Sequence, residues 1–98
     1  MNTRIHSVHF HADVKLLGFI EEKLQKIEHF FDQITSTEIF LKLDKHSLVK
    51  DKVVEIKVGL PGKTLFCEDS SKSFEQSFEA ALHCMVQQVR KHKEKIRA

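Results

Sequence analysis

The stretch KVVEIKVGLPGKTLFCE, residues 52 to 68, predicts a β-hairpin at the centre of a sheet. Apolar and polar side chains alternate from Lys52 to Leu60, so this strand has one apolar face. Pro61-Gly62-Lys63 is a tight-turn signal, and Thr64 to Glu68 then predicts a short partner strand. The apolar face needs a covering layer, which the rest of the chain must supply. The side chains that we expect to point inward are Val54, Ile56, Val58 and Leu60.

The segments before the hairpin predict a strand, a helix and another strand. Thr3 to Phe10 is the first strand, and Asp13 is a suitable N-cap for a helix over Val14 to Phe31. Thr35 to Asp44 alternates as the second strand, and Lys45 to Lys50 is polar enough for a loop. The apolar stripe of the helix consists of Leu16, Leu17, Ile20, Leu24, Ile27 and Phe31.

A long helix follows the hairpin, and its two halves differ in character. Asp69 to Ser73 is expected to open this helix, because Asp and Ser favour helix N-termini. Its first three turns are apolar at helical spacing, with Phe74, Phe78, Leu82, Met85 and Val89. Its end is basic: five of the 16 basic residues lie in the last nine positions, among them Arg90, Lys91, Lys93 and Lys95.

These elements predict an α+β fold in the order β-α-β-β-β-α. Each element has one apolar side, so we expect an open four-stranded sheet with both helices on one face. Residues 1–98 are enough for a single domain. The first residues lack the apolar stretch of a secretory signal, and no apolar run approaches the ~18 residues of a membrane span. We therefore expect a cytoplasmic protein that has no membrane partner.

The cysteines and histidines give weak signals for chemistry. Cys67 and Cys84 lie in apolar stretches without metal-ligand spacing, so we expect two buried free thiols. His9 and His11 alternate onto one face of the first strand, but no third ligand follows from the spacing, which leaves a metal or redox site as the least favoured hypothesis. Gly-rich phosphate loops and nucleophile elbows are missing from the sequence. We expect no catalysis, no metal or other cofactor, and no small-molecule substrate.

The first predicted helix has two flanks of opposite charge beside its apolar stripe. Lys15, Lys23 and Lys26 lie on one flank, and Phe19 and Phe30 fall among them. An aromatic ring there is covered either by another part of the chain or by a ligand. The other flank consists of Glu21, Glu22, Gln25 and Glu28.

The basic residues of both helices allow two interpretations. In the first, the lysines of the first helix and the basic end of the last helix form one surface that tracks nucleic-acid phosphates. In the second, the basic end is a solvated helix terminus that the helix dipole favours. Two or three cations would satisfy the dipole, and five exceed that need.

The sheet face that the helices leave uncovered suggests a different class of function. It could dock another protein, and Phe40 and Val53 are its best candidate contacts. It could equally be a solvated face, because its charges are mixed. The residues expected on it are Glu38, Phe40, Lys42, Val53, Glu55 and Lys57.

Two segments carry a family resemblance: KLQKIEHFFD, residues 23 to 32, and QVRKHKEK, residues 88 to 95. Together with Ile5 and the order of the elements, they resemble the short ribosome hibernation promoting factors, also called ribosome-associated inhibitor or sigma-54 modulation proteins. The resemblance covers almost the whole chain.

The resemblance implies a domain similar to double-stranded-RNA-binding folds that occupies the mRNA and tRNA channel of the small ribosomal subunit. It would inhibit translation there in stationary phase or under stress. The partners implied are the small subunit and its rRNA, and a weak homodimer is left open. The residues carried over by position as RNA-binding are Lys23, Lys26, Arg90, Lys91, Lys93 and Lys95, and the flank pattern adds Lys15.

The chain departs from the family pattern in the last helix. Family members commonly have a lysine and an arginine where this chain has Cys84 and Gln87, so two cations are missing. The chain also ends soon after the domain, so we expect it to lack the additional C-terminal domain with which long members pair two ribosomes. Any role in ribosome dimerisation would then need a separate factor.

Overall fold

The structure is a computed structural model that describes residues 2–97, with the side chains of residues 3–95. The order of elements is the predicted β-α-β-β-β-α. The elements are strand β1 (Asn2–Ser7), helix α1 (Val14–Phe30), strands β2 (Ser36–Leu43), β3 (Lys52–Leu60) and β4 (Lys63–Ser71), and helix α2 (Phe74–Arg97).

The four strands form one sheet in the order β1-β2-β3-β4. β1 runs parallel to β2, and α1 provides the crossover connection that a parallel pair requires. β2, β3 and β4 are antiparallel to their neighbours. The β3–β4 hairpin turns at Pro61–Gly62, where Gly62 has a φ of 75°, a left-handed conformation that glycine adopts without steric cost. The hairpin predicted from the sequence is confirmed.

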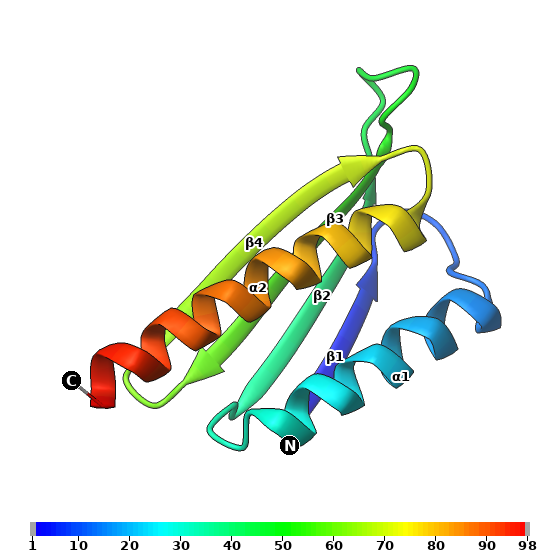
Figure 1. Cartoon of the computed structure of the whole chain (residues 1–98). Helices are drawn as coiled ribbons and strands as arrows, with labels where there is room; N and C mark the ends of the chain where they lie inside the picture. The colour runs from blue at the N-terminus through cyan, green and yellow to red at the C-terminus, as the bar shows by residue number, and fades with distance from the viewer. Residues whose placement is uncertain (1, 98) are drawn as a thin grey trace.

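Both helices cover the same face of the sheet, as predicted (Figure 1). The core lies between the helices and that face, because this is where the apolar sides of all elements can leave water together. Every apolar residue predicted for the stripe of α2 is buried. The inward-pointing residues of β3 are buried too. No helix within residues 2–97 is long and apolar enough to cross a membrane.

Side-chain caps fix where the helices begin. The Asp13 carboxylate accepts a hydrogen bond from the backbone N–H of Leu16 at 2.7 Å, which confirms Asp13 as the N-cap of α1. At α2 the Ser73 hydroxyl accepts from the backbone N–H of Gln76 at 3.2 Å. The helix therefore begins at Phe74. Most of the Asp69–Ser73 segment that was predicted to open it belongs to β4 instead.

Two strand boundaries differ from the prediction by more than one residue. The first strand ends at Ser7 instead of Phe10, because His9 has a left-handed φ of 65° and Phe10 stacks on Phe74 with ring centroids 5.1 Å apart. The last strand continues from Glu68 to Ser71. The hairpin register pairs Ser71 with Lys52, so cross-strand pairing overrides the turn preference of these polar residues.

The expectation of two free thiols is wrong. Cys67 and Cys84 form a disulfide that joins β4 to α2. The strand alternation turns Cys67 toward the helices, α2 crosses above it, and the two Cα atoms lie 6.3 Å apart, within the range that a disulfide spans. Their separation of 17 residues in the sequence gives no hint of this proximity.

Candidate nucleic-acid interface

The cationic flank of α1 faces α2. The Phe19 ring packs edge-on against the Phe78 ring at 6.0 Å between centroids. The Lys23 ammonium lies 4.0 Å from the Glu79 carboxylate and 5.5 Å from the centre of the Phe19 ring. Lys15 and Lys26 are exposed on the same flank by helical rotation. The flank predicted from the sequence thus borders the junction between the two helices.

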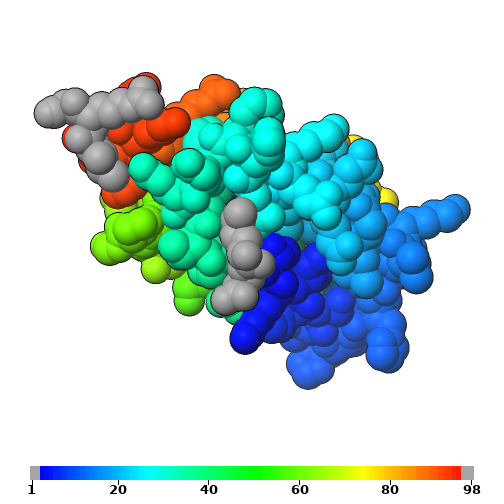
Figure 2. Space-filling model, turned by 90° about the horizontal axis from the view of Figure 1, so that it is seen from below, coloured from blue at the N-terminus to red at the C-terminus, as the bar shows by residue number. Residues whose placement is uncertain are grey.

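The basic end of α2 divides between two sides of the helix. Arg90 and Lys93 line a groove that they share with the end of α1, and the Lys93 ammonium lies 5.9 Å from the centre of the Phe31 ring. Figure 2 shows this part of α2 in orange and red beside the segment that ends α1. Lys91 and Lys95 line a different concavity, on the side of the β3–β4 hairpin. The structure therefore joins only part of the predicted basic residues to the α1 flank.

Lys63 is a candidate that the sequence analysis missed. It begins β4 and lines the same concavity as Lys91 and Lys95, so three lysines meet where the hairpin turn approaches α2. The sequence shows Lys63 only as part of a turn. Its proximity to the basic end of α2 depends on how far α2 extends along β4, which a local pattern does not reveal.

Most of these cations are available to a partner. Among the side chains of residues 3–95, the ion pairs formed by the predicted RNA-binding residues are limited to Lys23 with Glu79. Both partners of that pair are substantially exposed, so it is weak in water. A polyanion can therefore replace Glu79 as the partner of Lys23 at low cost.

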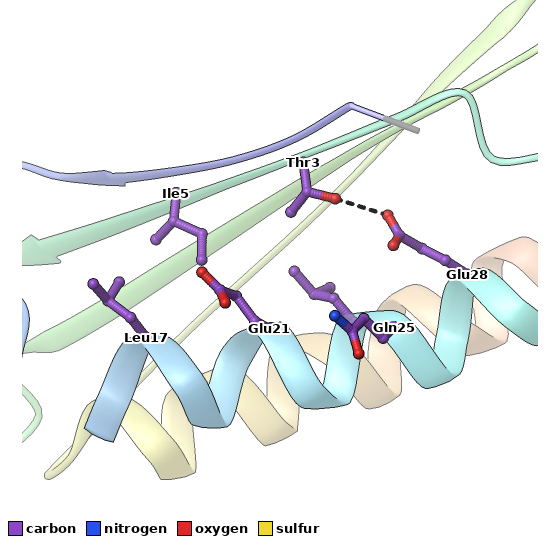
Figure 3. A pocket seen from close by; sticks show the side chains of 7 residues that line it. Thr3, Ile5, Leu17, Glu21, Gln25 and Glu28 are labelled. Atoms are coloured by element: carbon purple, nitrogen blue, oxygen red, sulfur yellow. Dashed lines mark hydrogen bonds between the residues drawn. The ribbon is translucent and has the colours of Figure 1, made fainter. Parts of the chain in front are cut away.

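The acidic flank of α1 faces the other way, toward β1. A groove of about 470 Å³ lies between these elements, and Glu21, Gln25 and Glu28 line it (Figure 3). The Thr3 hydroxyl donates to Glu28 at 2.9 Å. The carboxylates are thus separated from the lysines by the width of the helix. A polyanion would be repelled at this groove and attracted at the α1–α2 junction.

The open sheet face has mixed charge. Lys42 pairs with Glu55 at 2.7 Å, and Glu55 lies directly opposite Glu68 in the β3–β4 register. Burial, together with the hydrogen bond and charge of Glu55, raises the pKa of the Glu68 carboxyl. Phe40, predicted as a docking contact, stacks on the His6 ring at 4.8 Å, and Val53 is half-buried. Docking of a protein on this face stays a prediction.

The histidine pair predicted as a weak metal signal does not lie on one strand face. β1 ends at Ser7, so the alternation that would align His9 with His11 does not extend to them. Within the described residues, no three His, Cys, Asp or Glu side chains gather in a way that could hold a metal ion. The disulfide also removes Cys67 and Cys84 from the set of thiolate ligands.

Known proteins share both the sequence pattern and the fold. Residues 3–97 match the family described as Sigma 54 modulation protein / S30EA ribosomal protein. The chain belongs to this family. Its members are ribosome-binding proteins without enzymatic activity, which is the class that the sequence resemblance predicts.

Individual known proteins resemble the chain over nearly its full length. The ribosome hibernation promoting factor of Pseudomonas putida is 26% identical over 95 residues, covering 97% of this chain and 89% of that protein. A ribosomal subunit interface protein from Coxiella burnetii has the same fold, with a TM-score of 0.85, 24% identity and coverage of 96% and 99% of the two chains. The N-terminal domain of Protein Y from Thermus thermophilus gives a TM-score of 0.78 at 20% identity, covering 94% and 99%.

The departures from the family pattern have different structural settings. Cys84, where family members commonly have a lysine, is half-buried in the disulfide and lies 3.6 Å from the amide nitrogen of Gln88. Gln87 is exposed and lies 3.3 Å from His83. A cation at position 87 would face solvent, whereas one at position 84 would have to displace a covalent contact to β4.

Proposed function

We propose that this protein binds the small ribosomal subunit in the channel used by messenger and transfer RNA, and inhibits translation there in stationary phase or under stress. Membership of the family supports this function, as does the name of the Pseudomonas putida relative, a ribosome hibernation promoting factor. The protein would then act by occupying the channel, which requires no catalytic group.

One structural observation carries the proposal. Cations from two helices meet along the α1–α2 junction, while Glu21 and Glu28 of α1 face β1. This arrangement gives the molecule an RNA-facing side and an RNA-repelling side. The proposed contacts are with phosphates, which fix position without reading base edges. The side chains proposed to bind at the junction are Lys15, Lys23, Lys26, Arg90 and Lys93. Lys91 and Lys95, with Lys63, are proposed to bind phosphates at the neighbouring concavity beside the β3–β4 hairpin.

Binding of this kind depends strongly on salt. Each neutralised phosphate releases counterions, so about six contacts would reduce the affinity by roughly three orders of magnitude between about 50 and 200 mM salt. A neutral or apolar interface would show a much smaller change. The salt dependence therefore separates the proposed mode of binding from a protein-protein contact.

The test is co-sedimentation of the purified protein with small ribosomal subunits across a salt series. We expect stoichiometric binding at low salt that weakens steeply as salt rises. A variant with Lys23, Lys26, Arg90 and Lys91 all replaced by alanine should lose binding while keeping its melting temperature, because these side chains are outside the core.

The matched control removes the same charge elsewhere. The control replaces four exposed lysines away from the α1–α2 junction by alanine, which also lowers the net charge by four. These lysines are Lys45, Lys50, Lys57 and Lys72. This control should retain most of its binding. Equal losses in both variants would mean that only net charge matters, and an absence of wild-type binding at low salt would refute the function.

A further inference from the structure

Phe30 is an exposed aromatic ring in a cationic setting. It is the last residue of α1, and 70% of its surface is exposed. Phe19, on the same flank, is covered by Phe78 of α2. The structure thus separates the two rings that the sequence placed among the lysines: the chain itself covers Phe19, and Phe30 is left with an open face.

The ring borders a groove with an apolar floor and a cationic rim. The groove has a volume of about 550 Å³, within the ~300–1,000 Å³ typical of small-ligand sites. Ile27, Phe31 and Val86 are its other apolar residues, and all three are partly buried against the core. The charged residues are Arg90, Lys93 and Glu94.

This combination fits one unstacked nucleotide of single-stranded RNA. A base presents a flat face that stacks on an aromatic ring whatever its identity, and its flanking phosphates need cations close by. Lys93 already lies against Phe31, at 5.9 Å from the ring centre, so its ammonium is held beside the apolar floor. Arg90 can bind a phosphate through two parallel N–H donors or stack on a base.

We propose that the groove between the end of α1 and α2 binds one extruded base of single-stranded RNA, stacked on Phe30, with Arg90 and Lys93 at the adjacent phosphates. This site deepens the proposed function, on which it rests, because it adds a base-dependent contact to phosphate recognition. The charge of the rim selects RNA over an apolar protein segment, which would gain nothing from two cations.

Single substitutions at Phe30 test the proposal by fluorescence anisotropy with a short labelled oligoadenylate at low salt. Stacking is worth about 5-fold to 150-fold in affinity per base, so Phe30→Ala should weaken binding by about tenfold. Phe30→Trp should bind at least as well as the wild type. Phe30→Leu, which is apolar but not aromatic, should bind like the alanine variant.

The control variant is Val14→Ala. Val14 is 85% exposed at the opposite end of α1, so this variant also removes exposed apolar surface from the helix. Its affinity for oligoadenylate should equal that of the wild type. The melting temperatures of all variants should agree closely, because neither side chain is in the core.

An abasic oligonucleotide of the same length provides the decisive comparison. It keeps the phosphates and loses the bases, so wild type and Phe30→Ala should bind it equally. Equal weakening of both oligonucleotides by Phe30→Ala would overturn the proposal in favour of backbone contact. Equal oligoadenylate binding by wild type and Phe30→Ala, or no oligoadenylate binding by the wild type, would also overturn it.

Co-sedimentation with small subunits keeps this test separate from that of the proposed function. If the wild type sediments with subunits while the effect of Phe30→Ala on oligoadenylate is missing, the stacking site is refuted and ribosome binding stands. If the wild type does not sediment with subunits at all, the proposed function is refuted.

Discussion

Cys67 of β4 and Cys84 of α2 are covalently joined, with 17 residues of sequence separation and 6.3 Å between their Cα atoms. The bond fastens α2 to the edge of the sheet at Cys84, six residues before the basic end begins at Arg90. The Gln88 amide nitrogen lies 3.0 Å from the Cys67 sulfur and also donates to the carbonyl of Phe66 at 3.1 Å. The position of the basic end relative to the sheet is therefore held by both covalent and hydrogen bonds.

Reduction of this disulfide should destabilise the fold. Closing a loop of this length stabilises a protein by about 3 kcal/mol in the chain-entropy treatment. For a chain of this size, we expect dithiothreitol to lower the melting temperature by on the order of 10 °C. Calorimetry of oxidised and reduced protein measures the shift, and a Cys67→Ser, Cys84→Ser variant should match the reduced form. The idea fails if dithiothreitol leaves the melting temperature of the wild type unchanged.

Replacing Glu68 by Gln should stabilise the protein at neutral pH. Burial and the neighbouring Glu55 raise the pKa of Glu68, so the folded state favours the protonated carboxyl. The stability that this group contributes is present below the unfolded pKa near 4.5 and is lost as pH rises through the higher folded pKa.

The stability gained by Glu68→Gln should thus appear as pH rises above the unfolded pKa near 4.5 and vanish below that pH. Because the side chain is largely exposed, we expect only on the order of a few tenths of a kcal/mol. Melting temperatures of both proteins across pH provide the measurement. A difference in melting temperature that does not vary with pH would contradict the raised pKa of Glu68.

Lys63→Ala should weaken binding to the small subunit and make it less sensitive to salt. Lys63 joins Lys91 and Lys95 at one concavity, so its removal should lower the slope of log affinity against log salt by about 0.9 per lost phosphate contact. Lys72→Ala, an exposed lysine before α2, is the matched control and should leave the slope unchanged. If the two variants behave alike, Lys63 is not part of the interface.

Glu94→Gln should strengthen binding to single-stranded RNA. Glu94 contributes the carboxylate to the groove beside Phe30, where it repels the phosphates that Arg90 and Lys93 attract. We expect a gain of a few-fold in oligoadenylate affinity at low salt, which should shrink as salt screens the charge. Glu75→Gln, at the other end of α2, is the control. An unchanged affinity for Glu94→Gln would place the phosphates elsewhere.

Phe78→Ala should cost about 3–5 kcal/mol of stability, because Phe78 is fully buried and its ring packs against Phe19 of α1. Phe66→Ala, on the open sheet face with 51% of its surface exposed, should cost far less. Chemical denaturation of the two variants gives the comparison. Similar losses of stability in the two variants would contradict the burial of Phe78 in the core.

The order of elements could be predicted because apolar periodicity is a local property of the chain. The stripe of α2, the alternation of β3 and the Asp13 cap each follow from residues close in sequence, and each is confirmed. Boundaries were less predictable where distant contacts compete with local preference. Ser71 belongs to β4 because Lys52 pairs with it, and Phe10 leaves β1 to stack on Phe74.

The candidate site was predictable in part. The charge of each helix flank depends only on helical rotation, so the sequence could assign Lys23 to one side of α1 and Glu28 to the other. It could not assign Arg90 and Lys91 to different sides of the final interface, because that depends on where the end of α1 and the hairpin turn meet α2. The likeness to double-stranded-RNA-binding folds, and the RNA-binding role of these residues, stay predictions.

The sequence alone determined which residues leave water and which flanks of the helices are charged, since both depend on spacing along the chain. Only the tertiary structure decided the contacts between residues that are distant in sequence. It joined Cys67 to Cys84, added Lys63 to the basic end of α2, covered Phe19 and left Phe30 open. The reason is physical: burial of the apolar stripes fixes how the helices lie on the sheet, and that placement then determines which exposed side chains meet.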